Sequence, residues 1–253
     1  MPALFIEHGS PLSLDDKTWQ ADLRQVAEQL PKPKAVLIFS AHWEESSLHS
    51  GTTESVPLEY DFSGFPEHYY RVKYPAPPAP GLADRVETLL QDFGPMRRAD
   101  RGWDHGVFIP LLSMYPEADV PVLQMAVPSK NPETLLALGR ALSPLRKEGV
   151  LILGAGYLIH NLRLVQLGDR DAPPPPWALE FDAWAADALT RRDNAALARF
   201  RSEAPHIRNA LPTDEHFLPL FIPLGAADPD EAAQFPITGF LFGTLDRRSV
   251  RWG

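Results

Sequence analysis

The chain has 253 residues and no cysteine. Without cysteine there are no disulfides, no thiolate nucleophile and no Cys-ligated zinc, so a bound metal must use His, Asp or Glu. Basic residues are also few: 24 Lys and Arg stand against 33 Asp and Glu, which gives a formal net charge of -9. Because binding to a phosphate backbone needs a basic face, we expect no nucleic-acid partner.

Long apolar runs are missing as well. No stretch approaches the roughly 20 apolar residues that cross a bilayer, and the first residues lack the basic and apolar regions of a signal peptide. We therefore expect a cytoplasmic protein with no membrane contact. Nothing in the chain resembles a linker, which predicts a single domain over residues 1–253. The sequence leaves the oligomeric state open.

Short apolar runs alternate with amphipathic stretches along the chain, and this pattern is typical of α/β folds. We predict one domain with three layers, α/β/α, around a central mixed and largely parallel sheet. The expected strands are 3–6, 35–40, 120–127 and 150–153, with antiparallel strands late, between 240 and 252. The expected helices are 16–30, 81–93, 132–147, 177–189 and 195–200. We expect a polar turn at 102–106, and we expect the aromatic stretch 46–74 to pack as a lid or pocket wall.

Three of the expected strands lead into a histidine, namely His8, His42 and His160. The carboxyl ends of parallel strands lie at one edge of a sheet, which is where α/β proteins bind ligands. Imidazoles suit iron, zinc, copper and nickel, and without thiolates such a site has only nitrogen and oxygen ligands. Position alone leaves two interpretations open: a histidine-based metal centre, or separate core and turn histidines with ordinary hydrogen bonds.

Two other motifs give only weak evidence, one for a nucleotide-binding loop and one for a nucleophilic serine. Residues 154–156 (GAG) follow a strand, but they lack the third glycine and the acidic residue of the dinucleotide fingerprint, so we expect no nucleotide cofactor there. Ser10 does not lie in a Gly-x-Ser-x-Gly elbow, and Pro11 removes the backbone N–H that such an elbow offers to an oxyanion. Serine hydrolysis is therefore disfavoured.

Five segments together resemble the class III extradiol ring-cleaving dioxygenases (LigB-like superfamily), in the single-subunit branch of the DOPA 4,5-dioxygenase type. They are HGSP at 8–11, SAHWE at 40–44, DHG at 104–106, GAGYLIHN at 154–161 and EHFLPL at 215–220. The segments occur in the order of the family and run through nearly the whole chain. One of them alone would be weak evidence, whereas five in order are specific.

The resemblance implies a set of metal ligands. His8 and His42 would bind the metal, and His216 stands where this branch is expected to supply another ligand. The usual facial triad has two histidines and one carboxylate. If that rule holds here, Glu215 or Glu44 would be the third ligand and His216 a hydrogen-bonded partner outside the coordination sphere. The implied metal is Fe(II) in the active form, and Zn(II) in a resting or crystallised form.

The resemblance also implies catalytic roles. His160 would be the catalytic base, which can also reach the metal in a resting zinc form, and His105 would line the pocket and hydrogen-bond the substrate or oxygen. A neutral histidine with a pKa near the working pH can take a catechol proton and later return it. Related enzymes often carry serine where Ala155 stands and a smaller or polar residue where Ile159 stands, so the resemblance does not determine pocket polarity or substrate choice here.

The expected activity is Fe(II)-dependent insertion of O2 into a catechol ring of the DOPA kind, which gives a ring-opened semialdehyde. The partners would be a small aromatic diol and O2, with Arg208, Tyr157 and Tyr69 as candidate anchors for the ring substituent. One alternative is a zinc-dependent hydrolase of a small amide or ester, with His160 as the base. Another is a non-catalytic binding protein similar to the Memo proteins, although a scaffold has no physical need for the full histidine set.

Overall fold

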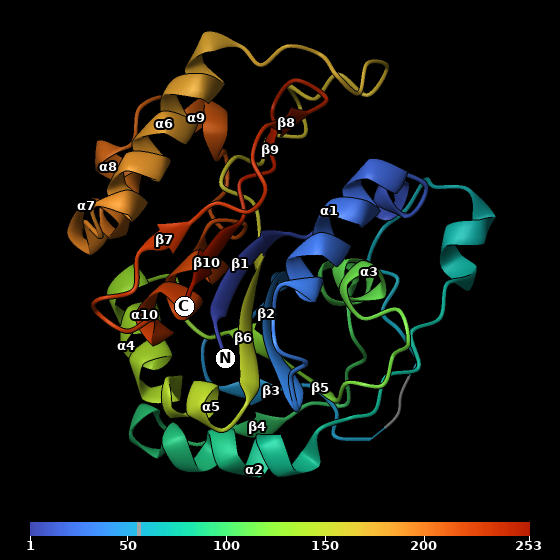
Figure 1. Ribbon diagram of the computed structural model, residues 1–253, viewed down its shortest axis with the longest axis vertical. Coiled ribbons are helices and arrows are strands. Elements are labelled where there is room, and N and C mark those ends of the chain that lie inside the picture. The colour runs from blue at the N-terminus through green and yellow to red at the C-terminus, as the bar shows by residue number, and fades with distance from the viewer. Residues whose placement is uncertain (55–56) are drawn as a thin grey trace.

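The structure is a computed structural model that describes residues 1–54 and 57–253. In these residues eight strands form one sheet in the order β4-β3-β5-β2-β6-β1-β10-β7 (Figure 1). The strands are β1 (Ala3–Glu7), β2 (Ala35–Glu44), β3 (His49–Ser50), β4 (Arg97–Arg98), β5 (Val122–Val127), β6 (Val150–Gly156), β7 (Ala233–Gln234) and β10 (Val250–Trp252). A separate hairpin is formed by β8 (Phe240–Leu241) and β9 (Leu245–Asp246).

The centre of the sheet is parallel, because β5, β2, β6 and β1 pair in that order with parallel register. Every residue of β1 and β6 is buried, as expected for strands covered on both faces. β10 pairs antiparallel with β1, so the late strand belongs to the main sheet. The predicted mixed, largely parallel sheet is therefore confirmed, and the carboxyl ends of β1, β2 and β6 lie side by side.

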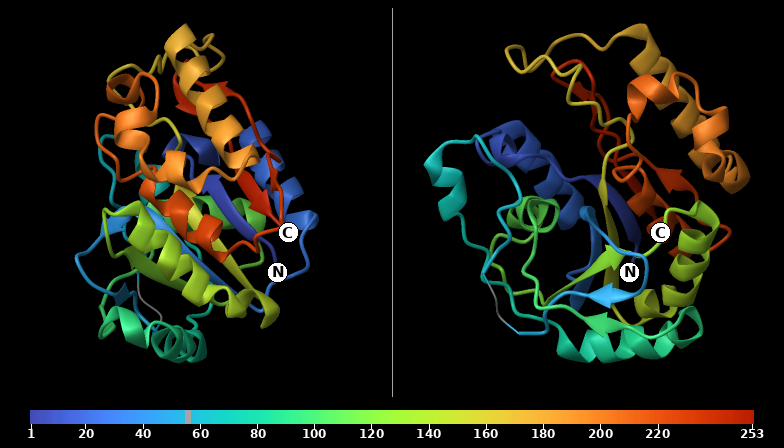
Figure 2. Two further views of the ribbon diagram at one scale, coloured as in Figure 1. Left: turned by 90° about the vertical axis from the view of Figure 1, so that its left-hand side faces the viewer. Right: turned by 180° about the vertical axis from the view of Figure 1, so that it is seen from behind.

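Two layers of helices cover the sheet, as predicted. Alternate residues of β1 enter different cores: Ala3 and Phe5 belong to one, Leu4 and Ile6 to the other. The second core is closed by α1 (Lys17–Glu28) and α3 (His105–Met114). The first is closed by α2 (Pro80–Leu89), α4 (Pro132–Leu142), α5 (Pro144–Lys147), α6 (Pro176–Thr190) and α10 (Phe221–Ala226) (Figure 2). The remaining short helices are α7 (Asn194–Ala198), α8 (Phe200–Glu203), α9 (Ile207–Ala210) and 3-10 turns at Pro11–Leu14, Glu67–Arg71, Gln91–Phe93 and Leu218–Leu220.

Several expected boundaries differ from the structure. The expected helix 132–147 is two helices, because Pro144 lacks the N–H that would continue the first one. Similarly, the expected helix 195–200 is divided between α7 and α8. The expected polar turn 102–106 holds the start of α3, which begins at His105. Within the expected irregular stretch 46–74, residues 55 and 56 lie outside the described part of the chain.

The most useful difference concerns β2, which continues to Glu44 instead of ending near Ser40. Its pairing with β5 shifts register between Phe39 and Glu44, so the strand has an irregularity there. His42 therefore lies within the last part of a strand and not in the loop after it. A strand position fixes the ring more firmly than a loop position does.

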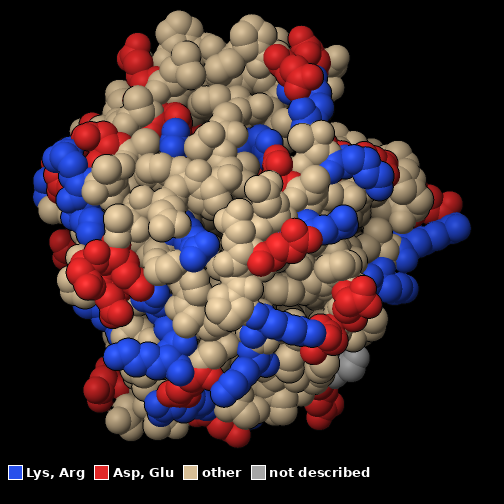
Figure 3. Space-filling view, viewed as in Figure 1, with Lys and Arg blue, Asp and Glu red and all other residues tan. Residues whose placement is uncertain are grey.

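Acidic and basic side chains are interspersed on the face shown in Figure 3. Several of them form ion pairs, such as Arg85 with Glu148 at 2.7 Å. Within the described residues, none of the helices combines the length and the apolar character that a membrane crossing requires.

Candidate metal centre

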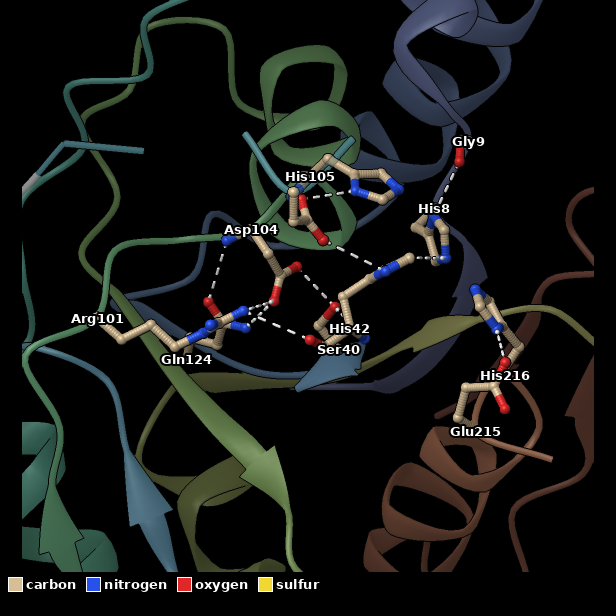
Figure 4. A network of polar contacts seen from close by, with 11 residues as sticks. His8, Gly9, Ser40, His42, Arg101, Asp104, His105, Gln124, Glu215 and His216 are labelled. Carbon is tan, nitrogen blue, oxygen red and sulfur yellow. Dashed lines mark hydrogen bonds and ion pairs between the residues drawn. The ribbon is translucent and has the colours of Figure 1, made fainter. Parts of the chain in front are cut away.

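Five histidines meet at the carboxyl edge of the sheet, and Figure 4 shows four of them, His8, His42, His105 and His216. His8 follows β1, His42 lies in the last part of β2, His105 begins α3, His160 follows β6 and His216 precedes the 3-10 turn at Leu218–Leu220. The ring centroids of His42 and His105 are 3.9 Å apart, and those of His8 and His42 are 4.8 Å apart. His160 and His216 are stacked at 3.4 Å. The structure thus brings together all five histidines that the sequence singled out.

The ligand atoms at this edge form two groups, and within each group they are close enough to share an ion. His8, His42 and His105 each offer a ligand atom within 4.8 Å of the others, and His160, Glu215 and His216 form a second group of this kind. The closest approach joins Nε2 of His8 to Nε2 of His42, at 3.2 Å. His105, which the sequence placed only in the pocket wall, therefore also lies at ligand distance.

Hydrogen bonds orient the rings of His8 and His216. Nδ1 of His8 lies 2.8 Å from the carbonyl oxygen of Gly9, and Nδ1 of His216 lies 3.0 Å from Oε1 of Glu215. Each Nδ1 therefore carries a proton that it donates to an oxygen, which leaves Nε2 with a free lone pair. Metal-bound histidines have this arrangement. Nε2 of His216 is buried and has no hydrogen-bond partner among the described residues.

Asp61 contacts two more of the rings, and no sequence pattern pointed to it. Its Oδ1 accepts hydrogen bonds from Nδ1 of His105 (2.8 Å) and from the His105 backbone N–H (3.0 Å), and its Oδ2 lies 3.3 Å from Nδ1 of His42. Burial alone would raise the pKa of Asp61, but the hydrogen bond and the nearby charge of His105 outweigh it and lower the pKa to about 2. Asp61 is therefore ionised and fixes the ring orientation of both histidines.

The rings of His8, His42, His160 and His216 are neutral at neutral pH. Burial, together with neighbouring histidines, lowers the pKa of His42 to about 3 and holds the pKa values of His8 and His216 well below the usual range. Burial also lowers the pKa of His160 to about 4, partly offset by Glu215. Neutral imidazole is the form that binds a metal or accepts a proton.

These observations together fit a divalent metal ion. Nδ1 of His8 donates to Gly9, so Nε2 of His8 has a free lone pair, and it lies 3.2 Å from Nε2 of His42; this separation requires a proton or a cation between the two nitrogens. Two nitrogens that each lie about 2.1 Å from one ion are separated by about 3 Å when they bind at right angles. The donor set of nitrogen and carboxylate oxygen suits iron, zinc, copper or nickel.

A buried network of hydrogen bonds connects the two elements that carry His42 and His105. Asp104 is fully buried at the N-terminus of α3, where its Oδ1 accepts a hydrogen bond from the Ser40 hydroxyl at 2.7 Å and its Oδ2 accepts one from the Gln124 amide. The Ser40 oxygen in turn accepts a hydrogen bond from the backbone N–H of His42 at 3.2 Å. The network therefore joins the end of β2, which carries His42, to the start of α3, which carries His105.

A second network holds the loop after β1. Glu7 is fully buried, and its Oε2 accepts a hydrogen bond from the Gly9 backbone N–H at 3.1 Å. Burial raises the pKa of Glu7 to about 7, although the Arg247 guanidinium opposes the rise. Arg247 also donates to Asp22 at 2.7 Å. Neither Glu7 nor Arg247 was identified from the sequence, because their pairing joins the two ends of the chain.

Four of the histidines, His8, His42, His105 and His160, line a cavity of about 380 Å³. That volume accommodates one aromatic ring with a short substituent. Its walls are mostly apolar and include Phe62, Phe65, Leu162, Val165, Leu167 and Phe242. The aromatic stretch 46–74 thus contributes to the pocket wall.

Three candidate anchors and one candidate ligand can now be placed. Tyr157 lines the cavity, whereas Arg208 and Tyr69 are not among its lining residues in the described chain. The Tyr69 hydroxyl instead donates to Asp15 at 2.6 Å. The carboxylate of Glu44 lies 3.4 Å from Lys130 and outside the cavity lining, while Glu215 contacts His216.

Comparison with known proteins agrees with this geometry. Residues 3–244 match the model of a family described as the catalytic LigB subunit of aromatic ring-opening dioxygenase. A protein of Escherichia coli (strain K12) named 4,5-DOPA dioxygenase extradiol is 36% identical, over 100% of this chain and 95% of its own. Another of that name, from Beta vulgaris, is 39% identical over 91% of this chain and 88% of its own.

A solved structure also matches over the full length of both chains. It is the crystal structure of an uncharacterized protein from Escherichia coli K12, with a TM-score of 0.84 and 33% sequence identity. Family match, relatives and fold therefore agree. The chain belongs to the LigB family of aromatic ring-opening dioxygenases, and its enzyme class is that of the extradiol ring-cleaving dioxygenases.

Proposed function

We propose that this enzyme inserts both atoms of O2 into a catechol ring, next to the two hydroxyl groups, with a ferrous ion held by the histidine cluster. The observation that carries the proposal is the 3.2 Å approach of Nε2 of His8 to Nε2 of His42 at the base of the cavity. Nε2 of His8 has a free lone pair, and the cavity beside the two nitrogens accommodates a single substituted ring. Membership of the family supports the same chemistry.

His8, His42 and His216 are the proposed metal ligands. Each of these rings has its Nδ1 within 3.3 Å of an oxygen atom, from Gly9, Asp61 and Glu215 respectively. This leaves three Nε2 atoms as donors. Glu215 then acts through His216, as a carboxylate that orients a metal-binding ring commonly does. His160, stacked on His216, would reach the ion in a resting zinc form.

When bound, a ferrous ion would supply coordination positions for the two catechol oxygens and for O2, together with the electron transfer between them. The protein supplies proton transfer and exclusion of water. His160 is neutral and lines the cavity, so one of its ring nitrogens can accept the second catechol proton and return it later. His105 is held through Nδ1 by Asp61, which leaves its Nε2 free to hydrogen-bond the substrate.

Oxygen consumption tests the proposal directly. The purified protein is loaded anaerobically with Fe(II) and then mixed with air-saturated buffer and a panel of catechols. We expect one O2 consumed per catechol and a yellow ring-opened product, with neither seen for the metal-free protein. Hydrolysis of an ester or amide by the zinc-loaded protein, without O2 uptake from any catechol by the iron-loaded one, would identify a hydrolase instead.

A further inference from the structure

Part of the cavity wall is apolar and built from two segments that are distant in the sequence. One is the segment 162–167, which contributes Leu162, Val165 and Leu167; the other is the turn between β8 and β9, which contributes Phe242. Leu162 and Leu167 are 66% and 68% exposed. Two leucines this exposed beside a cavity are available to be covered by a ligand.

Backbone hydrogen bonds fasten these two segments to each other. The Phe242 N–H donates to the Arg170 carbonyl at 2.8 Å, and the Gln166 N–H donates to the Phe242 carbonyl at 2.9 Å. Phe242 has φ of +53°, which is strained for a bulky side chain, and Gly243 follows with φ of +82°. The turn thus keeps an aromatic side chain at a position that favours glycine or asparagine. We call Leu162, Val165, Leu167 and Phe242 the apolar wall.

Phe62 and Phe65 add further apolar surface to the cavity lining. Phe62 packs edge-on against Phe65 with ring centroids 5.6 Å apart, and edge-on against His105 at 5.8 Å. A ring bound at the histidines would therefore share the cavity with Phe62 as well as with the apolar wall. A substituent of that ring would meet mainly carbon atoms.

The second observation concerns the charged side chains in and near the cavity. Among the described residues that line the cavity there is no lysine or arginine, and the one carboxylate is that of Asp61. Two arginines close to the apolar wall in the sequence are held in ion pairs: Arg170 with Asp16 at 2.6 Å and Arg247 with Asp22 at 2.7 Å. Arg163 is exposed and does not line the cavity.

From these observations we infer that the apolar wall selects catechols whose ring substituent is uncharged and apolar, such as an alkyl chain, over catechols that carry a carboxylate or an amino-acid group. This inference rests on the proposed function. An alkyl group would cover Leu162 and Leu167 and remove apolar surface from water. A carboxylate in the same place would lose water without gaining a cation, and it would share the cavity with the Asp61 carboxylate.

A matched substrate pair tests the inference. 4-Propylcatechol and 3-(3,4-dihydroxyphenyl)propionate have side chains of the same length, which end in a methyl group or a carboxylate. We expect kcat/KM of the Fe(II)-loaded enzyme to be about tenfold or more higher for 4-propylcatechol, and higher than for DOPA. Ring cleavage of the propionate or of DOPA with equal or higher kcat/KM would overturn the inference and leave the proposed function standing.

Binding provides a readout that does not depend on turnover. Zinc has no redox chemistry, so calorimetric titration of the zinc-loaded protein with the same two catechols measures affinity alone. We expect tighter binding of 4-propylcatechol. If the iron-loaded enzyme consumed no O2 with any catechol, the proposed function would fail, and the calorimetric preference would still decide whether the apolar wall selects the substituent.

Variants assign the preference to the apolar wall. We expect Leu167→Lys to raise kcat/KM for the propionate relative to 4-propylcatechol by about tenfold, because the new ammonium group can pair with the carboxylate. Phe242→Asn, which suits the left-handed backbone, should weaken the preference for the propyl group. Leu164→Lys is the matched control, because Leu164 is 42% exposed in the same segment and does not line the cavity. A control that shifted the ratio as much as Leu167→Lys would overturn the assignment, as would a Leu167→Lys enzyme with an unchanged ratio.

Discussion

The imidazole of His160 lies parallel to that of His216, with ring centroids 3.4 Å apart and planes inclined by 14°. The two rings differ in what surrounds them. His216 is almost completely buried, and its Nδ1 is occupied by Glu215. His160 is less buried and lines the cavity. The buried ring is the better placed to hold an ion, and the one at the cavity surface is the better placed to exchange a proton with a substrate.

Replacing His160 with alanine therefore separates catalysis from metal binding. We expect His160→Ala to keep most of its iron while kcat for catechol cleavage falls about 100-fold or more. Metal analysis of the purified variant and oxygen uptake measure the two effects. His42→Ala is the comparison variant, and it should lose both iron and activity. Activity retained by His42→Ala at normal iron content would remove His42 from the coordination sphere.

Asp61 offers a second test, because it contacts two rings of the cluster without being one of the proposed ligands. We expect Asp61→Asn to lower metal affinity about 10- to 100-fold, since the neutral amide can keep the hydrogen bond from Nδ1 of His105 but places no negative charge beside Nδ1 of His42. Competition with a chelator followed by metal analysis measures the affinity. Glu59→Gln, on the same segment but outside the cavity lining, is the matched control. An unchanged affinity in Asp61→Asn would show that the His42 and His105 orientations do not depend on this carboxylate.

The sequence predicted the parallel core and three of the histidines for a physical reason. Buried parallel strands are apolar runs, and their carboxyl ends share one edge of the sheet, so His8, His42 and His160 could be placed together before any coordinates were known. The roles of His105 and His216 came instead from the family resemblance. Neither residue follows a strand directly.

The supporting carboxylates could not be predicted in the same way. Asp61 lies in an irregular stretch, where no periodicity fixes the direction of a side chain. Glu7 pairs with Arg247, which lies 240 residues further along the chain. This contact depends on the pairing of β1 with β10, which brings the two ends of the chain together. A local sequence pattern does not show which distant strands pair. The extension of β2 to Glu44 was missed because polar residues replace the apolar run after Phe39.

The lowered histidine pKa values predict acid sensitivity of the metal-free protein. A histidine has a pKa of about 6.5 in an unfolded chain, against about 4 for His160 and about 3 for His42 in the fold. Between about pH 6.5 and 4 these histidines therefore bind more protons in the unfolded chain than in the folded one, so their contribution to stability falls as the pH falls. The single Glu7 carboxyl, whose pKa is raised to about 7, contributes in the opposite direction. Asp61, with a pKa of about 2, adds a loss of the same sign as that of the histidines below about pH 4.

Thermal unfolding of the metal-free protein at a series of pH values checks this. We expect Tm to fall steadily from about pH 6.5 to pH 4, and we expect the fall to be smaller in His160→Gln than in the unchanged protein. His49→Gln serves as the control, because His49 does not line the cavity, and its slope should match that of the parent. A Tm independent of pH over this interval would mean that the rings are not held neutral by the fold.

Gly106, at the start of α3, is required by the close approach of that helix to β2. A Cβ at this position would lie 2.4 Å from the Ser40 hydroxyl oxygen and 3.2 Å from Cδ2 of His42. The Ser40 hydroxyl donates to Asp104 in the buried network, so it cannot move without breaking that hydrogen bond.

We expect Gly106→Ala to lower the free energy of unfolding by about 1–3 kcal/mol and to weaken metal binding, because His42 and His105 are displaced relative to each other. Gly81→Ala in α2 is the matched control, since its Cβ would meet nothing within 4 Å, and there we expect a gain of about 0.4–1 kcal/mol. Urea denaturation of the two variants measures both changes, and equal midpoints would show that α3 can move away from β2 without cost.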